Sequence, residues 1–207
     1  MNFGQMQTEV RRKLNESSAT FWTDDDIKEA LNDGLEEISD ETEWYEREAT
    51  IQTTANRLYH DLRTVLPDTF LSLRRVWNAT VQRWMYPTTP REMDGSRSQW
   101  ELVHGEPHNV FMRGLFWLGQ WPKRNVDDGR SRVVYTALPL ALEDDEDSPA
   151  FPQEFQRGIV EYALSDLLSQ ERETAKAIAH WKEYLVYQEA LRRWVNGRQS
   201  LARLEVL

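Results

Sequence analysis

Two stretches with helical apolar periodicity, one near each end of the chain, limit the possible folds more than any other feature of the sequence. In residues 27–38, apolar side chains recur every three or four positions, so that they share one face of a helix. The same spacing returns in residues 155–168 and 178–195. A helix with a single apolar face must bury that face against another element. Since these stretches lie far apart along the chain, we expect the two ends to pack against each other.

The N-terminal stretch predicts two helices separated by a loop. Thr8 can cap a short first helix, and residues 15–20 have the composition of a loop. Thr23 is a favourable N-cap for the second helix, and three aspartates, residues 24–26, follow it in the first turn. The positive end of the helix dipole favours carboxylates at those positions. We therefore interpret the aspartates as the start of a helix that continues to about residue 42.

The C-terminal stretch predicts a pair of longer helices. An acidic linker, residues 143–147, precedes them, and Pro152 suits the first turn of a helix. The first helix is expected to end near residue 170 and the second at Asn196-Gly197, a dipeptide typical of a helix stop. The remaining residues, 198–207, are of mixed character, and we expect them to form a C-terminal arm.

The middle of the chain, residues 44–142, has the character of β structure. It is rich in β-branched and aromatic residues, and turn-forming Pro, Gly, Asn and Asp residues interrupt it. Asp128-Gly129 lies between two apolar segments, as the turn of a β-hairpin does. Short strands of this kind favour a small antiparallel sheet or a barrel-like insert. The expected strands are residues 45–53, 70–81, 110–121 and 132–140.

The sequence therefore predicts the α+β class, with a bundle of about four helices that carries a small antiparallel β subdomain as an insertion. The N-terminal pair of helices and the long C-terminal pair form this bundle. The predicted domains are residues 1–43 and 143–197 for the helical core, 44–142 for the β subdomain and 198–207 for the arm.

Composition argues against several classes of function. The chain has no cysteine, so disulfides, thiolate metal sites and a cysteine nucleophile are excluded. Its formal net charge is -10, which is unfavourable for binding free DNA through its phosphates. No apolar run reaches the roughly 18 residues of a membrane helix, and the first residues lack the apolar stretch of a signal peptide. We expect a protein that is made in a cytoplasm and does not contact a membrane.

Three groups of polar residues have the composition of metal sites, but their spacing is unfavourable. The aspartates 24–26 point in different directions around a helical turn, so they converge poorly on one ion. Residues 143–147 lack the glycine and the ligand spacing of an EF-hand. His104 and His108 are four residues apart, but the glycine and proline between them disfavour the helix that would direct both rings at one zinc ion. We predict no metal and no cofactor.

The β region leaves two further hypotheses open. Glu101 and Glu106 have the residue type of a glycosidase pair, beside tryptophans that could line a sugar groove, although nothing in the sequence fixes their separation. Arginines interspersed with aromatic residues are typical of a nucleic-acid face, or of subunit contacts in which Arg–carboxylate pairs fix the register. The acidic net charge favours subunit contacts. The tryptophans are Trp84, Trp100, Trp117 and Trp121, and the arginines are Arg74, Arg75, Arg83, Arg113, Arg130 and Arg132.

Four segments in a fixed order resemble the head-to-tail adaptor proteins of tailed phages, which form a ring beneath the portal. That family's aromatic–Ser/Thr–Asp start and its Asn-containing second helix are similar to residues 21–42, FWTDDDIKEALNDGLEEISDET. Its apolar strand ending in Arg-Val resembles residues 66–94, and its Gly-x-Pro before a strand resembles residues 105–112, GEPHNVFM. The acidic linker with Pro152, followed by two long helices that contain AIAHWKEYL in residues 177–185, completes the order.

The resemblance implies a structural protein of a virion neck, assembled in the host cytoplasm and without catalytic residues. It implies a homo-oligomeric ring, usually of twelve copies, with the helical core around a channel through which double-stranded DNA passes. The implied partners are the portal protein on one side and a tail, nozzle or stopper protein on the other. A closed ring needs two different flanks that fit each other head to tail, and a helical bundle supplies rigid ones.

Two groups of residues are candidate contact sites. The arm can become ordered on the portal by burying its leucines, and cationic residues of the last helix can contact a neighbouring subunit. The alternative is a carbohydrate- or receptor-binding virion protein that uses the Trp-rich β region, and an oligomeric scaffold unrelated to phages is a third possibility. The arm residues are Arg198, Leu201, Arg203, Leu204 and Leu207, and the inter-subunit residues are Lys182, Arg192 and Arg193.

Overall fold

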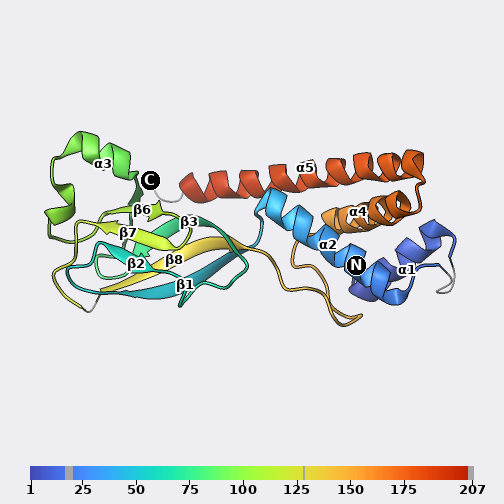
Figure 1. Cartoon of the computed structure of the whole chain (residues 1–207), viewed down its shortest axis with the longest axis horizontal. Helices are drawn as coiled ribbons and strands as arrows, with labels where there is room; N and C mark the ends of the chain where they lie inside the picture. The colour runs from blue at the N-terminus through green and yellow to red at the C-terminus, as the bar shows by residue number, and fades with distance from the viewer. Residues whose placement is uncertain (17–20, 128, 205–207) are drawn as a thin grey trace. The chain divides into compact units, whose positions relative to one another are not determined.

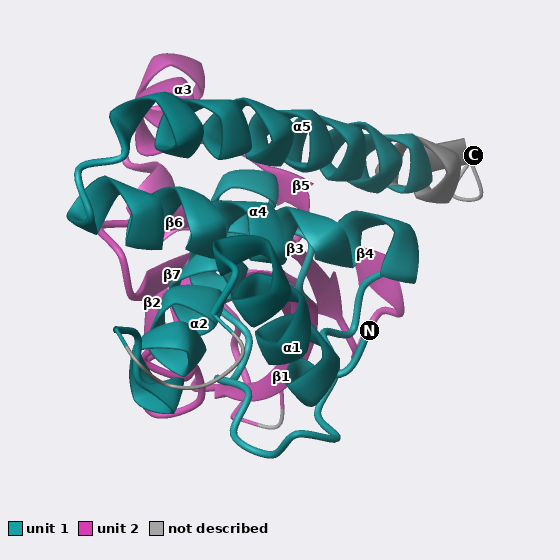
Figure 2. Cartoon of the chain, turned by 90° about the vertical axis from the view of Figure 1, so that its right-hand side faces the viewer, with its two compact units in different colours: residues 1–45, 138–207 teal, residues 46–137 magenta. Residues whose placement is uncertain are grey.

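The computed structural model divides the chain into two compact units (Figures 1 and 2). It describes residues 1–16, 21–127 and 129–204, without the side chains of residues 199–204. The helical unit consists of Met1–Tyr45 and Leu138–Leu207, and the β unit of Glu46–Ala137. Both ends of the chain therefore build one unit, and the segment between them builds the other.

Four helices form the described part of the helical unit, as the sequence predicts. The last two run antiparallel as a hairpin, and α2 packs on α4 (Figure 1). A Cβ added at Gly158 would lie 2.8 Å from the Cβ of Tyr187, so the absence of a side chain at this position lets α4 and α5 approach each other. The helices are α1 Phe3–Leu14, α2 Asp24–Thr42, α4 Gln153–Gln170 and α5 Thr174–Leu204.

The apolar faces of these helices meet in one core, which confirms that the two ends of the chain pack together. Leu31 on α2, Leu164 on α4 and Tyr184 on α5 are each fully buried there. Burial of a single leucine or isoleucine side chain contributes about 1.5–3 kcal/mol, so this core is the main source of stability of the unit. Other buried members are Phe3, Met6, Val10, Ile27, Leu35, Ile38, Ile159, Val160, Leu167 and Leu191.

Of the two predicted helix N-caps, Thr23 is confirmed and Thr8 is wrong. Thr23 caps α2, accepting a hydrogen bond from the backbone N–H of Asp26, while the Asp26 carboxylate accepts one in return from the N–H of Thr23. Thr8 does not cap α1, because that helix begins at Phe3, and the side chains of Asn2 and Gln5 form its capping box. Thr8 lies inside the helix instead, where its hydroxyl donates to the carbonyl of Gly4.

The acidic linker, residues 143–147, packs against the N-terminus of α1. The backbone N–H of Phe3 donates to the carbonyl of Asp147, and that of Gly4 to the carbonyl of Asp145. These are among the first N–H groups of a helix, which have no partner within the helix itself. The side-chain amide of the N-cap residue Asn2 also donates to the Glu146 carboxylate, so the linker holds α1 in the bundle.

The predicted helix stop at Asn196-Gly197 is wrong. α5 continues through it to Leu204, so the backbone of the predicted arm up to that residue is the last part of α5. A Cβ at Gly197 would have no atom within 4 Å, so this glycine is not required by a close contact. A glycine inside a helix costs only about 1 kcal/mol, which the rest of a long packed helix easily offsets. Residues 205–207 lie outside the described part of the chain.

The β unit contains two four-stranded sheets, where the sequence predicts a single small sheet or a barrel-like insert. One has the strand order β1-β8-β3-β4 and the other β2-β7-β6-β5. A short helix, α3 Pro90–Ser96, lies between β5 and β6 along the chain. The strands are β1 Glu46–Thr53, β2 Tyr59–Asp61, β3 Phe70–Asn78, β4 Arg83–Trp84, β5 Tyr86–Pro87, β6 Asn109–Arg113, β7 Trp117–Trp121 and β8 Gly129–Ala137.

All four predicted strand segments contain strands, but their pairing differs from the prediction. Residues 110–121 form the hairpin β6–β7, not one strand. The predicted hairpin at Asp128-Gly129 is wrong, because β7 pairs with β2 and β6 while β8 pairs with β1 and β3. The pairing of β5 with β6 is parallel, so the second sheet is mixed and not wholly antiparallel. With its helical bundle and separate sheets the protein has the predicted α+β fold.

Candidate interaction site

The outer face of α5 carries exposed apolar side chains. Ile178 is 49% exposed, Trp181 39%, Leu185 40% and Val186 63%. Their spacing along the helix places them on one side of it, next to the side that faces α4. Single exposed apolar residues are ordinary, but several on one side of a helix make that side a candidate contact surface.

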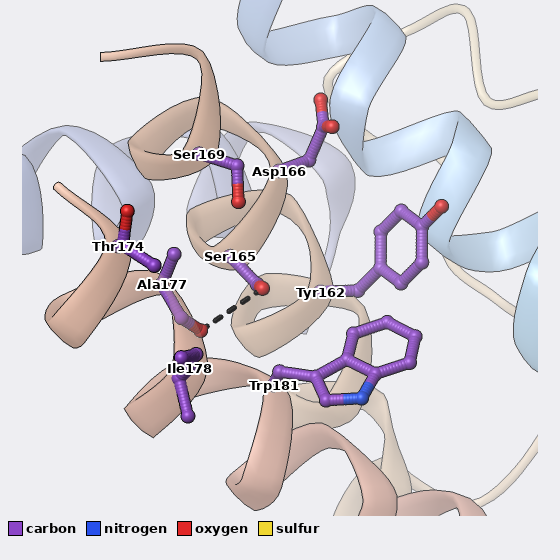
Figure 3. A pocket seen from close by; sticks show the side chains of 8 residues that line it. All are labelled: Tyr162, Ser165, Asp166, Ser169, Thr174, Ala177, Ile178 and Trp181. Atoms are coloured by element: carbon purple, nitrogen blue, oxygen red, sulfur yellow. Dashed lines mark hydrogen bonds between the residues drawn. The ribbon is translucent and has the colours of Figure 1, made fainter. Parts of the chain in front are cut away.

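A shallow pocket opens between α4 and α5, near the N-terminal end of α5 (Figure 3). Its volume is about 290 Å³, and we call it the α4–α5 pocket. The hydroxyl of Ser165 donates to the carbonyl of Ala177 at 3.0 Å, which fixes the two helices at its floor. Small side chains at these positions leave the space open. The lining residues are Tyr162, Ser165, Asp166, Ser169, Thr174, Ala177, Ile178 and Trp181.

Three aromatic rings form a wall beside the pocket. The ring of Trp181 lies 6.0 Å from that of Tyr162 and 5.0 Å from that of Tyr184, measured between centroids. Figure 3 shows the Tyr162 ring between Trp181 and the ribbon of α2. Ring contacts of this kind contribute about 0.5–1.5 kcal/mol beyond the area they bury, so the wall is stiff.

The surroundings of the pocket are negatively charged. Burial, and after it the carboxylates of Glu37 and Asp166, raise the pKa of Tyr162. Burial and then the neighbouring carboxylates of α2, Glu41 foremost, raise the pKa of Glu37. Each of these shifts has the sign expected where negative charges gather. The pocket therefore combines an apolar wall with an acidic rim, which suits a cationic and aromatic partner.

A buried ion cluster holds the helices behind the pocket in place. Glu161 on α4 is 4% exposed, and its carboxylate accepts hydrogen bonds from Lys13 of α1 at 2.5 Å and from the Nδ1 atom of His180 of α5 at 2.7 Å. Burial alone would raise the pKa of Glu161, but these two hydrogen bonds outweigh it and hold the pKa below its usual range. Through the Glu161 carboxylate, the cluster thus links α1, α4 and α5.

The β unit presents a second exposed surface, on the outer side of its first sheet. Arg132 on β8 lies opposite Trp77 on β3, and Trp77 lies opposite Trp84 on β4. The guanidinium of Arg75 lies 4.3 Å from the centroid of Trp84, and that of Arg132 lies 5.7 Å from it. Such cation–π contacts hold the guanidinium groups flat against the rings. We call Arg75, Trp77, Trp84 and Arg132 the Arg–Trp face.

The net charge of -10 is divided very unevenly between the units. Residues 46–137 contain 13 Lys and Arg against 10 Asp and Glu, a formal charge of +3. The remainder of the chain contains 12 Lys and Arg against 25 Asp and Glu, a formal charge of -13. The acidity of the protein is therefore a property of the helical unit alone.

The three cationic residues predicted to contact a neighbouring subunit all lie on α5. Lys182 is exposed. Arg192 donates to Glu41 of α2 at 2.8 Å, and Arg193 donates to Glu189 at 2.8 Å. Both arginines thus have carboxylate partners within the chain, and Arg192 also ties α5 to the end of α2.

The predicted portal-docking residues lie at the end of α5. Arg198 is exposed, and its guanidinium lies 4.2 Å from the centroid of the Trp194 ring. The backbone of Leu201, Arg203 and Leu204 belongs to α5, while their side chains lie outside the described part of the structure. Leu207 lies outside the described residues altogether.

Of the two carboxylates considered for a glycosidase site, Glu106 is already engaged within the β unit. Glu106 accepts a hydrogen bond from the buried Arg124 at 2.5 Å and another from Asn78 at 2.8 Å. Its carboxylate therefore compensates the charge of Arg124 inside the β unit. The Trp100 side chain is buried, and Trp84 belongs to the Arg–Trp face of the other sheet. These tryptophans therefore do not line one groove. Within the described residues, no group of three or more His, Cys, Asp or Glu side chains is arranged to hold a metal ion.

The comparison with protein families gives a match that covers nearly the whole chain. Residues 1–205 match the model of the SU10 adaptor protein family. The chain belongs to this family of phage head-tail adaptors. A search of curated proteins found no match to the chain.

As a member of this family, the adaptor is a structural component of a phage virion. The resemblance drawn from the four sequence segments is thereby confirmed at the level of the family. None of the helices described is both long and apolar enough to span a bilayer.

The sequence predicts one feature of the adaptor's surface in part and does not reveal another. The α4–α5 pocket joins residues of two helices whose relative register only the packing fixes, and no local pattern signals it. The Arg–Trp face is predicted in part, because Arg75 and Arg132 are among the arginines for which the sequence favours subunit contacts, and Arg75 and Trp77 share the outer side of one strand. The pairing of β3 with β8, which adds Arg132, is a long-range contact that the sequence does not reveal.

Proposed function

We propose that the adaptor forms a closed ring in the neck of the virion and joins the portal to a tail, nozzle or stopper protein. The observation that carries this proposal is the match of residues 1–205 to the adaptor family. The family resemblance implies twelve copies. The adaptor acts through its geometry, because matched interfaces between rigid subunits seal a coaxial conduit and no bond is made or broken.

The helical unit has the properties of a ring wall. Its four described helices share one core, and the Glu161 cluster links three of them, α1, α4 and α5, so that the unit can meet its neighbours without reshaping. Rings close when one flank of a subunit fits the other flank of the next, through different surfaces. The exposed side of α5 and the α4–α5 pocket supply one such flank.

The charge division supports placing the helical units around the channel. Their formal charge of -13 per copy repels the phosphates of double-stranded DNA, so that the genome passes without binding. A channel lined by the β units would carry +3 per copy and would retain DNA through its phosphates.

The end of α5 is the proposed site of docking on the portal. Arg198 and Arg203 offer charge there, and Leu201, Leu204 and Leu207 offer apolar surface. Lys182, Arg192 and Arg193 are the proposed contacts to a neighbouring subunit, in which the two arginines would exchange or share their present carboxylate partners.

The proposal is tested by mixing the adaptor with the portal protein of the same phage and imaging the product by cryo-electron microscopy. A ring of adaptor beneath the portal, with the end of α5 ordered at the junction, supports the proposal. Portal particles without adaptor density, with both proteins folded, would contradict it. A variant shortened after Asn196 is expected to lose binding to the portal while retaining its helical circular dichroism signal.

A further inference from the structure

We propose that the α4–α5 pocket of one copy receives the Arg–Trp face of a second copy. This inference rests on the proposed ring, and it names the two surfaces through which neighbouring copies meet. One surface lies on the acidic helical unit and the other on the cationic β unit, so the contact is heterologous and can close into a ring.

The pocket side offers apolar surface with a negative rim. Ile178 and Trp181 expose 49% and 39% of their surface beside the opening. Asp166 lines the pocket itself, and Glu37 of α2 acts on the Tyr162 ring that forms its wall. A partner that buries the apolar part must also bring positive charge to these carboxylates, because an unpaired carboxylate is costly to bury.

The Arg–Trp face offers the complementary chemistry. Arg75 stacks on Trp84 and, among the ion pairs of the described residues, has no carboxylate partner. Arg132 has one, Glu48, at 3.5 Å, with both side chains largely exposed. An arginine already held against a ring loses little side-chain freedom when it binds a carboxylate. Arginine and tryptophan are also the side chains that most often dominate the energetics of protein interfaces.

A second copy suits this face better than a nucleic acid does. Glu46 and Glu48 lie on the neighbouring strand β1, on the same side of the sheet as Arg132, and they interrupt the positive surface that a phosphate backbone requires. The excess negative charge of the chain lies in the helical unit, which every second copy brings with it. Exposed ion pairs alone contribute little to affinity, so the apolar pocket and the tryptophans must supply most of it.

Cross-linking between single-cysteine variants tests the contact directly, because the natural chain contains no cysteine. Ser169→Cys places a thiol at the pocket, and Thr50→Cys places one opposite Arg132 on the sheet. The two variants are mixed at high concentration, one of them carrying a size tag, and treated with a short bismaleimide. A cross-linked heterodimer is expected. The matched control is Glu154→Cys, which lies about 18 Å from Asp166 along α4 and is expected to give at least tenfold less product with Thr50→Cys.

Charge reversal separates a specific contact from chance collisions. Asp166→Arg in the Ser169→Cys chain, or Arg132→Glu in the Thr50→Cys chain, is expected to reduce the cross-linked product at least fivefold. Combining the two reversed chains is expected to restore it to within twofold of the unreversed pair. Product that is unaffected by single reversal, or no excess over the Glu154→Cys control, overturns the proposed contact.

The same variants distinguish failure of this inference from failure of the proposed ring. If the natural adaptor assembles beneath the portal and Arg132→Glu assembles equally well, the ring stands and this contact is wrong. If the natural adaptor does not bind the portal, the proposed function fails, and the cross-linking of the free protein decides the contact on its own. Thermal unfolding of each variant within a few degrees of the natural chain excludes misfolding as the cause of a loss.

Discussion

Among the described residues, the helical unit and the β unit each bury one ionised side chain, of opposite sign, and each neutralises it internally. In the helical unit the Glu161 carboxylate is held by Lys13 and His180. In the β unit the Arg124 guanidinium, 2% exposed, is held by Glu106 and by the side-chain oxygens of Asn78 and Thr80. Buried charges are stabilised by such partners, although the Nε atom of Arg124 is buried without a hydrogen bond to the described residues. The excess charge of each unit, -13 and +3, therefore lies on its surface, where it can act on partners.

The two cores differ in what surrounds these charges. The helical unit places Glu161 beside a continuous apolar core formed by all four helices. The β unit surrounds Arg124 with polar groups that are themselves buried, including Asn78, and Gln120 and Ser131 pair with each other close by along β7 and β8. A buried polar network loses stability when any member is removed, because the remaining groups stay desolvated. We therefore expect the β unit to be the more sensitive of the two to single substitutions at its charge centre.

The largest expected effect is that of Arg124→Met in the β unit. The substitution leaves the Asn78 side-chain oxygen without this donor and Glu106 without its cation, which costs about 3–5 kcal/mol. Hydrogen exchange measured by mass spectrometry is expected to show faster exchange in peptides of Glu46–Ala137 and little change in α2 and α4. The matched control is Arg63→Met, which breaks the exposed pair with Asp61 and is expected to leave the exchange of both units nearly unchanged. Equal loss of protection in both units would contradict their separate stabilisation.

A pH dependence confined to the β unit is the next largest effect. Burial, and after it Arg57 and Arg124, lower the pKa of His60 to about 4. The folded chain therefore keeps this imidazole neutral while the unfolded chain binds a proton below about pH 6.5, so stability falls as the pH drops from about 6.5 to 4. The full loss is about 3 kcal/mol. Urea unfolding of the natural chain and of His60→Gln at pH 7.5 and 4.5 measures it, and an equal pH dependence in both chains would refute the assignment to His60.

Glu161→Gln is expected to act on the helical unit to a smaller extent. The neutral amide cannot compensate the charge of Lys13, but the side chains of Lys13 and His180 are partly exposed, at 17% and 27%, and water can solvate them. We expect a loss of about 2 kcal/mol, less than for Arg124, whose site excludes water. Exchange should increase where α1 meets α4, with the β unit unchanged. A loss larger than that of Arg124→Met would reverse the comparison between the two centres.

The comparison also shows which parts of the fold the sequence could predict. The helical unit was predicted well, because Thr23 with its aspartates and the spacing from Ile27 to Ile38 are local signals of a capped, amphipathic helix. The prediction that α5 ends at Asn196-Gly197 is wrong, because the packing of a long helix outweighs the cost of one glycine within it. The capping box of Asn2 was missed because Thr8 offers the same local chemistry a few residues later.

In the β unit the strands were predictable and their partners were not. Residues 110–121 and 132–140 have strand composition, but the assignment of β7 and β8 to different sheets depends on contacts with β2 and β1, far away in the sequence. Arg124 follows Pro122 in a segment with no strand pattern, and no local feature indicates that its guanidinium is buried. The interaction site shares this property, since the α4–α5 pocket and the Arg–Trp face both arise from pairs of elements and not from a motif.

The smallest expected effect on stability, and the one that best separates surface from core, is that of Ile178→Ser. The side chain is 49% exposed on α5, so its replacement removes little buried apolar area and should change the free energy of unfolding by less than about 0.5 kcal/mol. Leu164→Ala on the neighbouring α4, fully buried, is the matched contrast and should cost about 2–5 kcal/mol. If the α4–α5 pocket binds a second copy, Ile178→Ser lowers self-association in sedimentation equilibrium, whereas Leu164→Ala lowers it only where the fold is lost. Because the two substitutions lie in adjacent helices of one unit, a variant that unfolds normally but no longer associates can be explained only by the outer surface of α5.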